Sequence, residues 1–419
     1  MTRRRRDRKE QLAGVAADLF RQRGYHAVGI GDIASAAGIT GPAVYRHFTN
    51  KQDILAHVLL SGVDTLAETV ARILATPAEP SARMADLTDA LARLAVERRD
   101  AVALWRWLGR HLDQERQAEV RRRGEAPMAL WIAELRRRRP ELSAADSDLL
   151  CTAAMGVFAS VADHTATLAK SRHVDLLRRL AGAVLASNVL PDADRAPDTD
   201  PTHDADPTPD ARPARNVPRP GDPATLAAPR RERLLIEATR LFRQRGYHAV
   251  TIEDIGAAAG IAGPSVYRHF SSKADLIHAA GARMADRLAA GAAEATAATT
   301  SPADALRRLV DSYAETVLAH RDLMAVYIAE LSSLPERQRG QLRRLQRGYV
   351  AEWVRLIAAV NPSWGSAEAR VAAHAAFTVA NDLARRGRLA NRPGLRREIA
   401  SLMRAVTGDA GGAGSPTDW

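Results

Sequence analysis

The stretch from Ala37 to Lys51 reads AGITGPAVYRHFTNK, and a near copy from Ala259 to Lys273 reads AGIAGPSVYRHFSSK. The two copies lie 222 positions apart, and across 19–53 and 241–275 the same offset gives 26 identical residues in 35. An internal repeat of this kind indicates that the same structural unit occurs twice in the chain. The chain is therefore organised around one short element that occurs twice.

Each copy of this element has a helical pattern interrupted by a tight turn. In the first copy, apolar residues recur at helical spacing before Gly24 and again before Gly38, and both glycines can end a helix. A third helix then starts near Thr40, a residue type that can cap it, and places Val44 and Phe48 in the core. The other side of this helix is polar and aromatic. The pattern predicts a helix, a short helix, a turn, and a helix with an outward polar face.

The short second helix of the element begins differently in the two copies. Thr251 with Asp254 three residues later predicts a capping box, in which each side chain binds the other's backbone amide. The first copy has Gly29 with Asp32, and glycine lacks the capping hydroxyl. We expect the second copy to have the better-capped helix.

The remainder of both halves also predicts helices, since neither strand alternation nor Asn-Gly hairpins occur. In the first half we expect helix breaks near 76–81, 98–100, 124–127, 140–143 and 171–173. The same offset of 222 also pairs Arg99-Asp100 with Arg321-Asp322, Trp131 with Trp353 and Pro140 with Pro362, although the match is weak in this region. We therefore expect two helical bodies, one behind each copy of the element.

The composition favours a polyanionic partner. Sixty Lys and Arg against 49 Asp and Glu give a net charge of +11 and a pI near 10.4, which attracts nucleic acid over long range. Charge alone also fits a basic surface that merely keeps the protein soluble. The single cysteine, Cys151, excludes an intrachain disulfide and a multi-cysteine zinc site. The uncharged run at 149–162 is shorter than the roughly 20 residues of a membrane helix, so we expect a cytoplasmic protein without a membrane partner.

Helix, short helix, glycine turn and polar-faced helix form a helix-turn-helix pattern, whose second helix enters the DNA major groove. With G-Y, D-I, A-A-G-I, Y-R-H-F and a following Lys in register twice, the sequence resembles the TetR family of transcriptional regulators. The resemblance implies an all-α fold with two tandem TetR-like units joined by a disordered linker. Each unit would have a three-helix DNA-binding domain and a helical body for ligand binding and dimerisation.

This resemblance divides the chain into six segments. The linker is rich in Pro and Asp and poor in large apolar residues, so it cannot bury enough surface to fold alone. The predicted segments are 1–55 (first helix-turn-helix domain), 56–190 (first body), 191–229 (linker), 230–277 (second helix-turn-helix domain), 278–408 (second body) and 409–419 (disordered tail).

The resemblance implies which residues of this sequence occupy the positions that contact DNA in the family. In the first copy they are Thr40, Gly41, Pro42, Ala43, Tyr45, Arg46, His47 and Lys51, and in the second Ala262, Gly263, Pro264, Ser265, Tyr267, Arg268, His269 and Lys273. Chemistry suggests a role for each type of residue. The two arginines can bind guanine bidentately or contact a phosphate instead, whereas Pro and Ala can contact a thymine methyl group. Tyr, His and Lys suit phosphates. The basic start, Arg3 to Arg6, is either a phosphate-tracking arm or a solvated end.

In the family, the helical body binds a small ligand and dimerises through its last two long helices. Here these helices would span 145–169 with 174–187, and 367–386 with 394–406. The effector would be a small apolar molecule, lipid-like or an acyl thioester, and no cofactor or metal is expected. Aromatic and sulfur side chains at helical spacing could line its site or simply form the core: Trp105, Trp107, Met128, Trp131, Met155 and Phe158 in the first half, and Met324, Tyr327, Tyr349, Trp353, His374 and Phe377 in the second.

The sequence leaves two forms of assembly open. One chain could fold as its own pseudo-dimer on an inverted-repeat operator, or two chains could form a homodimer with four heads. The expected function is a repressor released from double-stranded DNA by its effector. The alternative is a DNA-binding protein of architectural type that responds to no effector. An enzyme is not expected, because the scattered polar residues include no nucleophile motif, phosphate-binding glycine loop or metal-ligand spacing.

Overall fold

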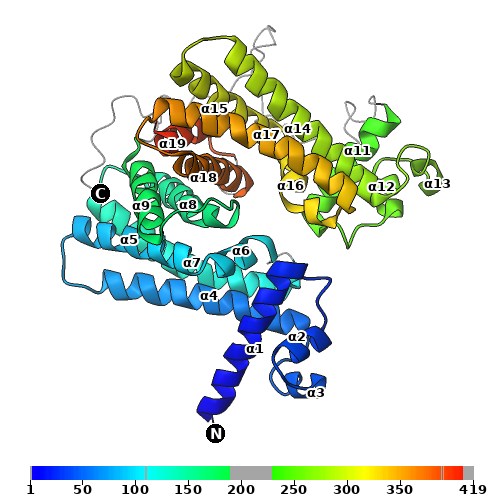
Figure 1. The fold of residues 1–419 in the computed structure, drawn as a ribbon, viewed down its shortest axis with the longest axis horizontal. Coiled ribbons are helices and arrows are strands. Elements are labelled where there is room, and N and C mark those ends of the chain that lie inside the picture. Colours follow the sequence, from blue (N-terminus) through cyan, green and yellow to red (C-terminus); the bar gives the residue numbers. More distant parts are fainter. Residues whose placement is uncertain (1, 109–110, 189–228, 388, 390, 409–419) are drawn as a thin grey trace, which may run out of the picture. The chain divides into compact units, whose positions relative to one another are not determined.

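The computed structural model describes residues 2–108, 111–188, 229–387, 389 and 391–408. These residues form helices joined by turns, and no strand occurs among them. The all-α expectation is therefore confirmed (Figure 1). The predicted linker at 191–229 lies outside the described residues except for its last residue, and so does the predicted tail.

Contacts divide the chain into two compact units. Unit 1 holds 1–189, 360–383 and 401–419, and unit 2 holds 190–359 and 384–400. Unit 1 thus combines the first half of the sequence with most of one late helix and the end of the last one. This division differs from the six segments along the sequence, whose boundaries remain predictions.

The first half consists of an amino-terminal head and a body. The elements are α1 (Thr2–Arg23), α2 (Ile30–Ala36), α3 (Gly41–Val44), α4 (Lys51–Leu74), α5 (Pro80–Glu97), α6 (Arg99–Leu108), α7 (Gln114–Arg138), α8 (Ala144–Ala159), the 3-10 turn η2 (Ser160–Ala162) and α9 (Lys170–Ala186).

The second half repeats the order of the α-helices, but its 3-10 turn follows the sixth helix instead of the eighth. The elements are α11 (Arg230–Arg245), α12 (Ile252–Ala258), α13 (Gly263–Val266), α14 (Lys273–Ala297), α15 (Pro302–Ala319), α16 (Arg321–Ala329), the 3-10 turn η4 (Leu331–Ser333), α17 (Glu336–Val360), α18 (Ser366–Arg385) and α19 (Leu395–Thr407).

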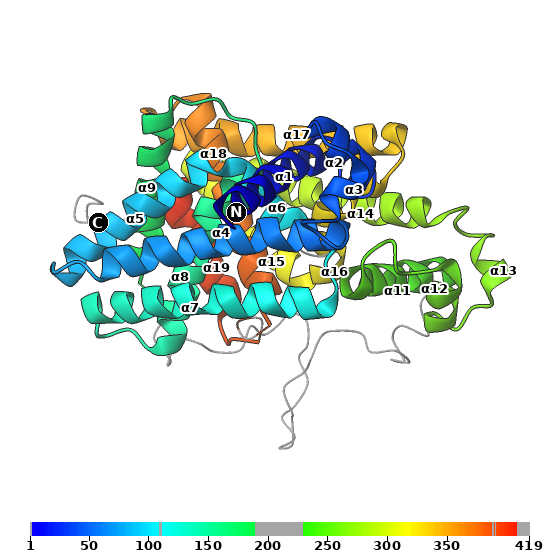
Figure 2. The ribbon, with the colours of Figure 1, turned by 90° about the horizontal axis from the view of Figure 1, so that it is seen from below.

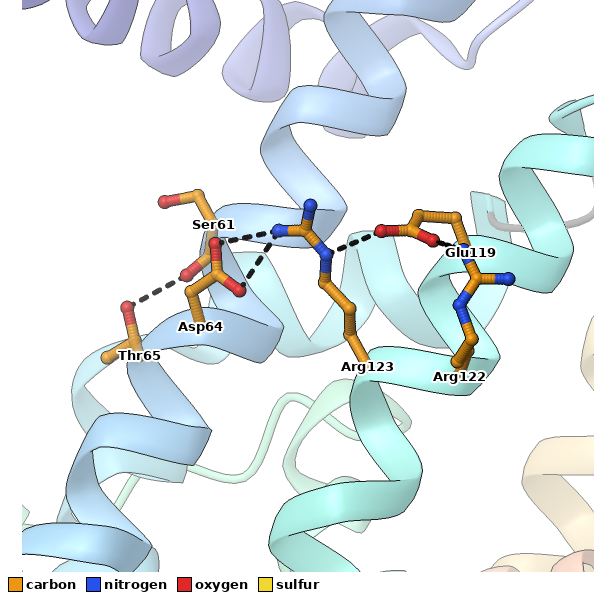
Figure 3. A network of polar contacts seen from close by, with 6 residues as sticks. All are labelled: Ser61, Asp64, Thr65, Glu119, Arg122 and Arg123. Carbon is orange, nitrogen blue, oxygen red and sulfur yellow. Dashed lines mark hydrogen bonds and ion pairs between the residues drawn. The ribbon is translucent and has the colours of Figure 1, made fainter.

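Helix α4 connects the first head to the first body. Asn50 caps its start by accepting a hydrogen bond from the Asp53 backbone N–H at 2.8 Å. Figure 2 shows α4 and α7 side by side, and this pair has the most extensive contact between helices in unit 1. On their exposed side, Arg123 of α7 bridges Glu119, at 2.7 Å, and Asp64 of α4, at 3.4 Å (Figure 3). Such surface ion pairs stabilise the protein little, so apolar burial holds the two helices together.

Two of the predicted helix breaks in the first half are wrong. Helix α7 runs without interruption through 124–127, although Pro127 removes one backbone hydrogen bond. Pro127 is buried in the same helix as Trp131 and Leu135, which are 1% and 0% exposed, so burial of this face outweighs the local signal. The break expected at 171–173 instead lies before α9, between η2 and Lys170.

Helix α18 packs against first-half helices within unit 1. A Cβ atom on Gly156 of α8 would lie 3.3 Å from the Val379 Cα of α18, so the two helix backbones approach closely there. Arg106 of α6, whose side chain is 3% exposed, lies between Asp163, at 3.1 Å, and Asp382 of α18, at 2.9 Å. Close backbone approach and a buried ion-pair network therefore join α18 to the first body.

Candidate nucleic-acid interface

Each head has a small apolar core that fixes its third helix. Val44 and Phe48 are 0% and 2% exposed, as the helical spacing predicted, and they belong to one core with α1 and α2. The equivalent Val266 and Phe270 are 0% and 4% exposed in the second head. The core of each head thus sets the direction in which the rest of the segment points.

The opposite side of this segment faces solvent in both heads. Tyr45 is 58% exposed and Tyr267 is 53% exposed, although both are large aromatic residues. Thr40, Pro42 and Arg46 are also exposed, whereas Gly41, Ala43 and His47 are partly buried, and the second copy repeats this pattern position by position. The structure therefore brings the predicted contact residues of each head onto one accessible face.

A glycine turn sets the angle between the second and third helices of each head. Gly38 and Gly260 have φ values of 66° and 64°, which disfavour residues with a Cβ atom. The next amide, that of Ile39, donates back to the Ala34 carbonyl at 3.0 Å, and the Ile261 amide does the same to Gly256 at 2.8 Å. Both turns therefore have the same geometry.

The two heads differ at the start of their second helix, as the sequence predicted. Thr251 Oγ1 accepts the Asp254 N–H at 3.0 Å, while the Asp254 carboxylate accepts the Thr251 N–H at 2.9 Å. In the first head only the second of these bonds exists, because Asp32 accepts the Gly29 N–H at 2.7 Å and Gly29 has no side chain. Hydrogen bonds from the capping backbone hold the pKa of Asp254 below its usual value.

Thr40 does not form the cap that the sequence predicted. It occupies the capping position of α3, but its hydroxyl makes no capping hydrogen bond. Its counterpart Ala262 therefore lacks nothing that this helix needs. The hydroxyl of Thr40 distinguishes the two heads only through what it contacts outside the protein.

Lys51 and Lys273 have an intramolecular role that sequence reasoning missed. The Lys51 ammonium donates to the carbonyls of Tyr25 and Val28, both at 2.8 Å, and lies 4.3 Å from the centre of the Tyr25 ring. Lys273 makes the same contacts with the loop at 247–250. Burial lowers the pKa of both lysines. Each lysine clamps the loop before the second helix to the start of the fourth, and retains one further N–H donor.

The residues predicted to bind an effector lie in both units. In the first body, Trp131 and Phe158 are buried with ring centroids 6.3 Å apart, and the Trp131 indole N–H has no hydrogen-bond acceptor among the described residues. Met128 and Met155 are partly buried. The side chains of Trp105 and Trp107 lie outside the described part of the structure.

In the second body, Trp353 is fully buried and packs edge-on against Tyr313, with ring centroids 5.8 Å apart. Tyr349 lies beside Trp353, and Met324 and Tyr327 are buried in the same unit. His374 and Phe377 instead belong to unit 1, where their rings are in contact with each other. The structure therefore does not bring the second predicted set into one unit.

An open groove of about 580 Å³ lies beside the second head, between α11 and α14. None of the predicted effector-binding residues lines it. The lining residues are Arg231, His269, Phe270, Ser271, Asp275, His278, Ala279, Ala282, Arg283 and Asp286.

Among the described residues, two helical stretches satisfy the length and composition of a membrane span. They are α4 and the stretch formed by α8 with η2. In the second, 83% of the apolar window is buried inside the protein, including Cys151. The first packs against α1, α5 and α7. Among the described residues, no group of His, Cys, Asp or Glu is arranged to hold a metal ion.

Comparison with known proteins identifies both heads. The family model described as bacterial regulatory proteins of the tetR family matches residues 13–58 and 234–280. A second model, the tetracyclin repressor-like C-terminal domain, matches residues 299–385. The matches to the first model coincide with the two copies of the repeated element and the helices around it.

Individual relatives match over shorter stretches. The transcriptional activator FasR of Mycolicibacterium smegmatis is 40% identical over 84 residues, which are 20% of this chain and 38% of FasR. The transcriptional repressor KstR2 of Rhodococcus jostii is 33% identical over 122 residues, 29% of this chain and 60% of KstR2. The chain thus spans less than two thirds of these relatives.

Among solved structures, the ketosteroid regulator KstR2 of Mycobacterium tuberculosis matches with a TM-score of 0.40 and 22% identity, over 43% of this chain and 95% of that one. The family model occurs twice, and in each occurrence it covers a three-helix head with the same exposed face. The chain therefore carries two TetR-like heads, and the residues behind the second head match a tetracyclin repressor-like C-terminal domain, which agrees with a duplicated TetR-like chain.

Proposed function

We propose that the protein is a DNA-binding transcriptional regulator whose two heads read the two halves of an inverted-repeat operator. The observation that carries this proposal is the repeated outward face, on which Tyr45 and Tyr267, with their polar neighbours, have the same exposure. A large aromatic ring held in solvent on a short helix is suited to contact with a partner. The surplus of basic residues favours DNA as that partner.

Each side chain on this face has a proposed role. Arg46 and Arg268 bind guanine O6 and N7 in the major groove, and Pro42 and Ala43 contact a thymine methyl group. Tyr45, His47 and the third donor of Lys51 bind phosphates. The positions 262–265, 267, 269 and 273 act in the same way in the second head, without the hydroxyl of Thr40.

We further propose that one chain is a pseudo-dimer. Supporting observations are the contacts between α18 and first-half helices within unit 1: Arg106 with Asp382, Arg172 with Glu368 at 2.7 Å, and the close approach at Gly156. The contact at Gly156 joins α8 to α18, the eighth helix of each half, which is the arrangement a family dimer would need, while Arg106 and Arg172 bind α18 from α6 and α9. The rival assembly, a homodimer of chains, would place four heads on the DNA.

The regulatory step in this proposal is release of DNA by a small apolar effector, lipid-like or an acyl thioester. Its support is the first body, where the buried indole N–H of Trp131 lies beside Phe158 without an acceptor among the described residues. An effector can shift the equilibrium only through different affinities for the DNA-bound and free states, so effector and DNA must weaken each other equally. We propose a cytoplasmic location for this activity.

The first experiment is footprinting of the purified chain on DNA flanking its own gene, followed by mass measurement of the complex on the recovered site. One chain of 45.3 kDa per inverted repeat supports the pseudo-dimer, and two chains support the homodimer. Protection without sequence preference contradicts the regulator and supports an architectural DNA-binding protein.

The second experiment compares Arg46→Ala, Arg268→Ala and the control Arg72→Ala by gel shift at several salt concentrations. Arg72 is exposed near the far end of α4, so its loss removes the same charge away from the reading face. A base contact predicts a loss of about 1–3 kcal/mol with relaxed specificity at one position, and a phosphate contact a uniform loss with a salt slope lower by about 1. Losses equal to that of Arg72→Ala would exclude a reading role for the arginines.

A further inference from the structure

Three histidines from different parts of the sequence meet inside unit 1. His164 follows η2, His173 lies in α9, and His374 lies in α18. The ring centroid of His164 is 5.6 Å from that of His173 and 5.5 Å from that of His374. His164 and His173 are each only 5% exposed. Of the three, only His374 belongs to a predicted effector-binding set, and neither that set nor the reading heads give the grouping of the three rings a role.

The buried Nε2 atoms of two of these rings have no hydrogen-bond partner among the described residues. His164 Nδ1 accepts a hydrogen bond from the Ala166 backbone N–H at 3.2 Å, so the neutral ring carries its proton on Nε2. Nε2 of His164 and Nε2 of His173 are both buried and have no hydrogen-bond partner within the described ranges. Because buried polar atoms are nearly always paired, an unpaired His164 N–H in the described part of the structure points to a ligand acceptor.

Two arginines add positive potential at the same place. Arg99, at the start of α6, repels a proton on His164 and on His173, while Arg370 of α18 does so on His164 and His374. Both arginines are partly buried. Over the described part of the chain, neither guanidinium has a hydrogen bond or an ion pair. We call these five residues the His/Arg cluster.

The acidic residues next to the cluster are engaged elsewhere. Asp163 binds Arg106 at 3.1 Å and the Thr378 hydroxyl at 2.9 Å. Glu368 binds Arg172 at 2.7 Å and also accepts the Gly365 N–H at 2.7 Å. These two carboxylates therefore have their own partners among the described residues.

The charge state of the cluster favours an anion over a cation. Burial, together with the neighbouring cations, lowers the pKa of His164 to about 2 and that of His374 to about 4, so both rings are neutral at neutral pH. Neutral rings can ligate metal ions, but two adjacent guanidiniums repel a cation. No group of metal-ligating residues occurs in the described structure either. Guanidinium forks and imidazole N–H groups instead match the oxygens of a carboxylate or phosphate.

We propose that the His/Arg cluster is a binding site for a small oxyanion, carrying a carboxylate or a phosphate group, between α6, α9 and α18. The anion accepts the unpaired imidazole N–H bonds and pairs with Arg99 and Arg370. Because α18 comes from the second half of the sequence, the bound anion ties that helix to the first body. This inference goes beyond the proposed DNA-binding function and does not depend on it.

The test uses the full chain with isotope-labelled histidines and follows the imidazole carbon-bound proton resonances by NMR. Sodium phosphate and sodium acetate are the probes, and sodium chloride at equal ionic strength is the control. We expect saturable shifts of the three cluster histidines and a rise in the pKa of His164 and His374. His57 and His278, which lie outside the cluster, should not respond. Single His→Asn variants assign the resonances.

Two charge variants then test the geometry. Arg370→Gln and Arg99→Gln should each raise the half-saturating anion concentration at least about tenfold, the effect of losing one charge-assisted bond. Arg93→Gln is the matched control, because Arg93 is exposed and pairs with Asp89 on α5. A response to phosphate alone identifies a phosphate ligand, and a response to acetate alone identifies a carboxylate. Wild-type shifts that are absent, or that chloride reproduces, would overturn the proposal.

Discussion

The ion pairs of Arg106 allow a direct test of how tightly α18 is held in unit 1. We consider the substitution Asp382→Asn, which keeps the shape of the side chain and removes its charge. The Arg106 side chain is 3% exposed, and its two carboxylate partners are 16% and 20% exposed. Burial lowers the pKa of Arg106, but the attraction of Asp382 and Asp163 exceeds this effect and raises it overall. The guanidinium therefore remains charged in a mostly buried place.

The expected cost follows from these exposures. Two unit charges about 4 Å apart interact by about 4 kcal/mol at the effective dielectric of a protein, and part of this is lost to desolvation. The asparagine oxygen can still accept a hydrogen bond, and Asp163 still neutralises Arg106. Asp382→Asn should therefore destabilise the protein by about 1.5–3 kcal/mol, the net value of a hydrogen bond to a charged group. Arg106→Met leaves two carboxylates without their cation and should cost about 3–5 kcal/mol.

Urea unfolding of the full chain, followed by circular dichroism, measures these differences. Asp89→Asn is the matched control, because Asp89 and Arg93 form an exposed pair four residues apart, with side chains 34% and 59% exposed. Its loss should cost at most about 0.5 kcal/mol. The reasoning fails if Asp382→Asn and Asp89→Asn lose the same stability. It also fails if a double-mutant cycle of Arg106 and Asp382 gives no coupling, since contacting residues should couple by at least about 0.5 kcal/mol.

Three further predictions concern other parts of the fold. Gly29→Thr should stabilise the first head by a few tenths to about 1 kcal/mol, because it supplies the cap hydroxyl that Thr251 already provides, and Thr251→Gly should lose as much in urea unfolding. Gly156→Ala should cost about 1–3 kcal/mol because its Cβ presses on the α18 backbone, whereas Gly62→Ala, with open space around it, should gain up to about 1 kcal/mol. The depressed pKa of His164 means that the unfolded chain binds a proton more readily below pH 6.5. The contribution of the neutral His164 ring to the free energy of unfolding is thus fully present above pH 6.5. It falls by up to about 1.4 kcal/mol per pH unit as the pH drops. His164→Asn should flatten this slope between pH 6.5 and 5, and an unchanged slope would contradict the buried neutral ring.

Features that depend on neighbouring residues along the chain could be predicted from the amino-acid sequence. Helical spacing placed Val44 inward and Arg46 outward, and the glycine turn and the Thr251 capping box followed from residue types a few positions apart. The repeated stretch of sequence predicted two heads. These features are short-range, because a helix turns by a fixed angle per residue and a cap reaches only three residues.

Other features depend on contacts between residues that are far apart in the sequence. Lys51 clamps carbonyls 23 and 26 residues away, and Pro127 stays inside a helix because that helix is buried. His374 meets His164 across more than 200 positions, in a cluster that no spacing rule predicts. The physical reason is that burial depends on which helix faces pack together. The packing of helix faces depends on the sum of many weak apolar contacts across the whole chain, so it cannot be predicted from local residue patterns.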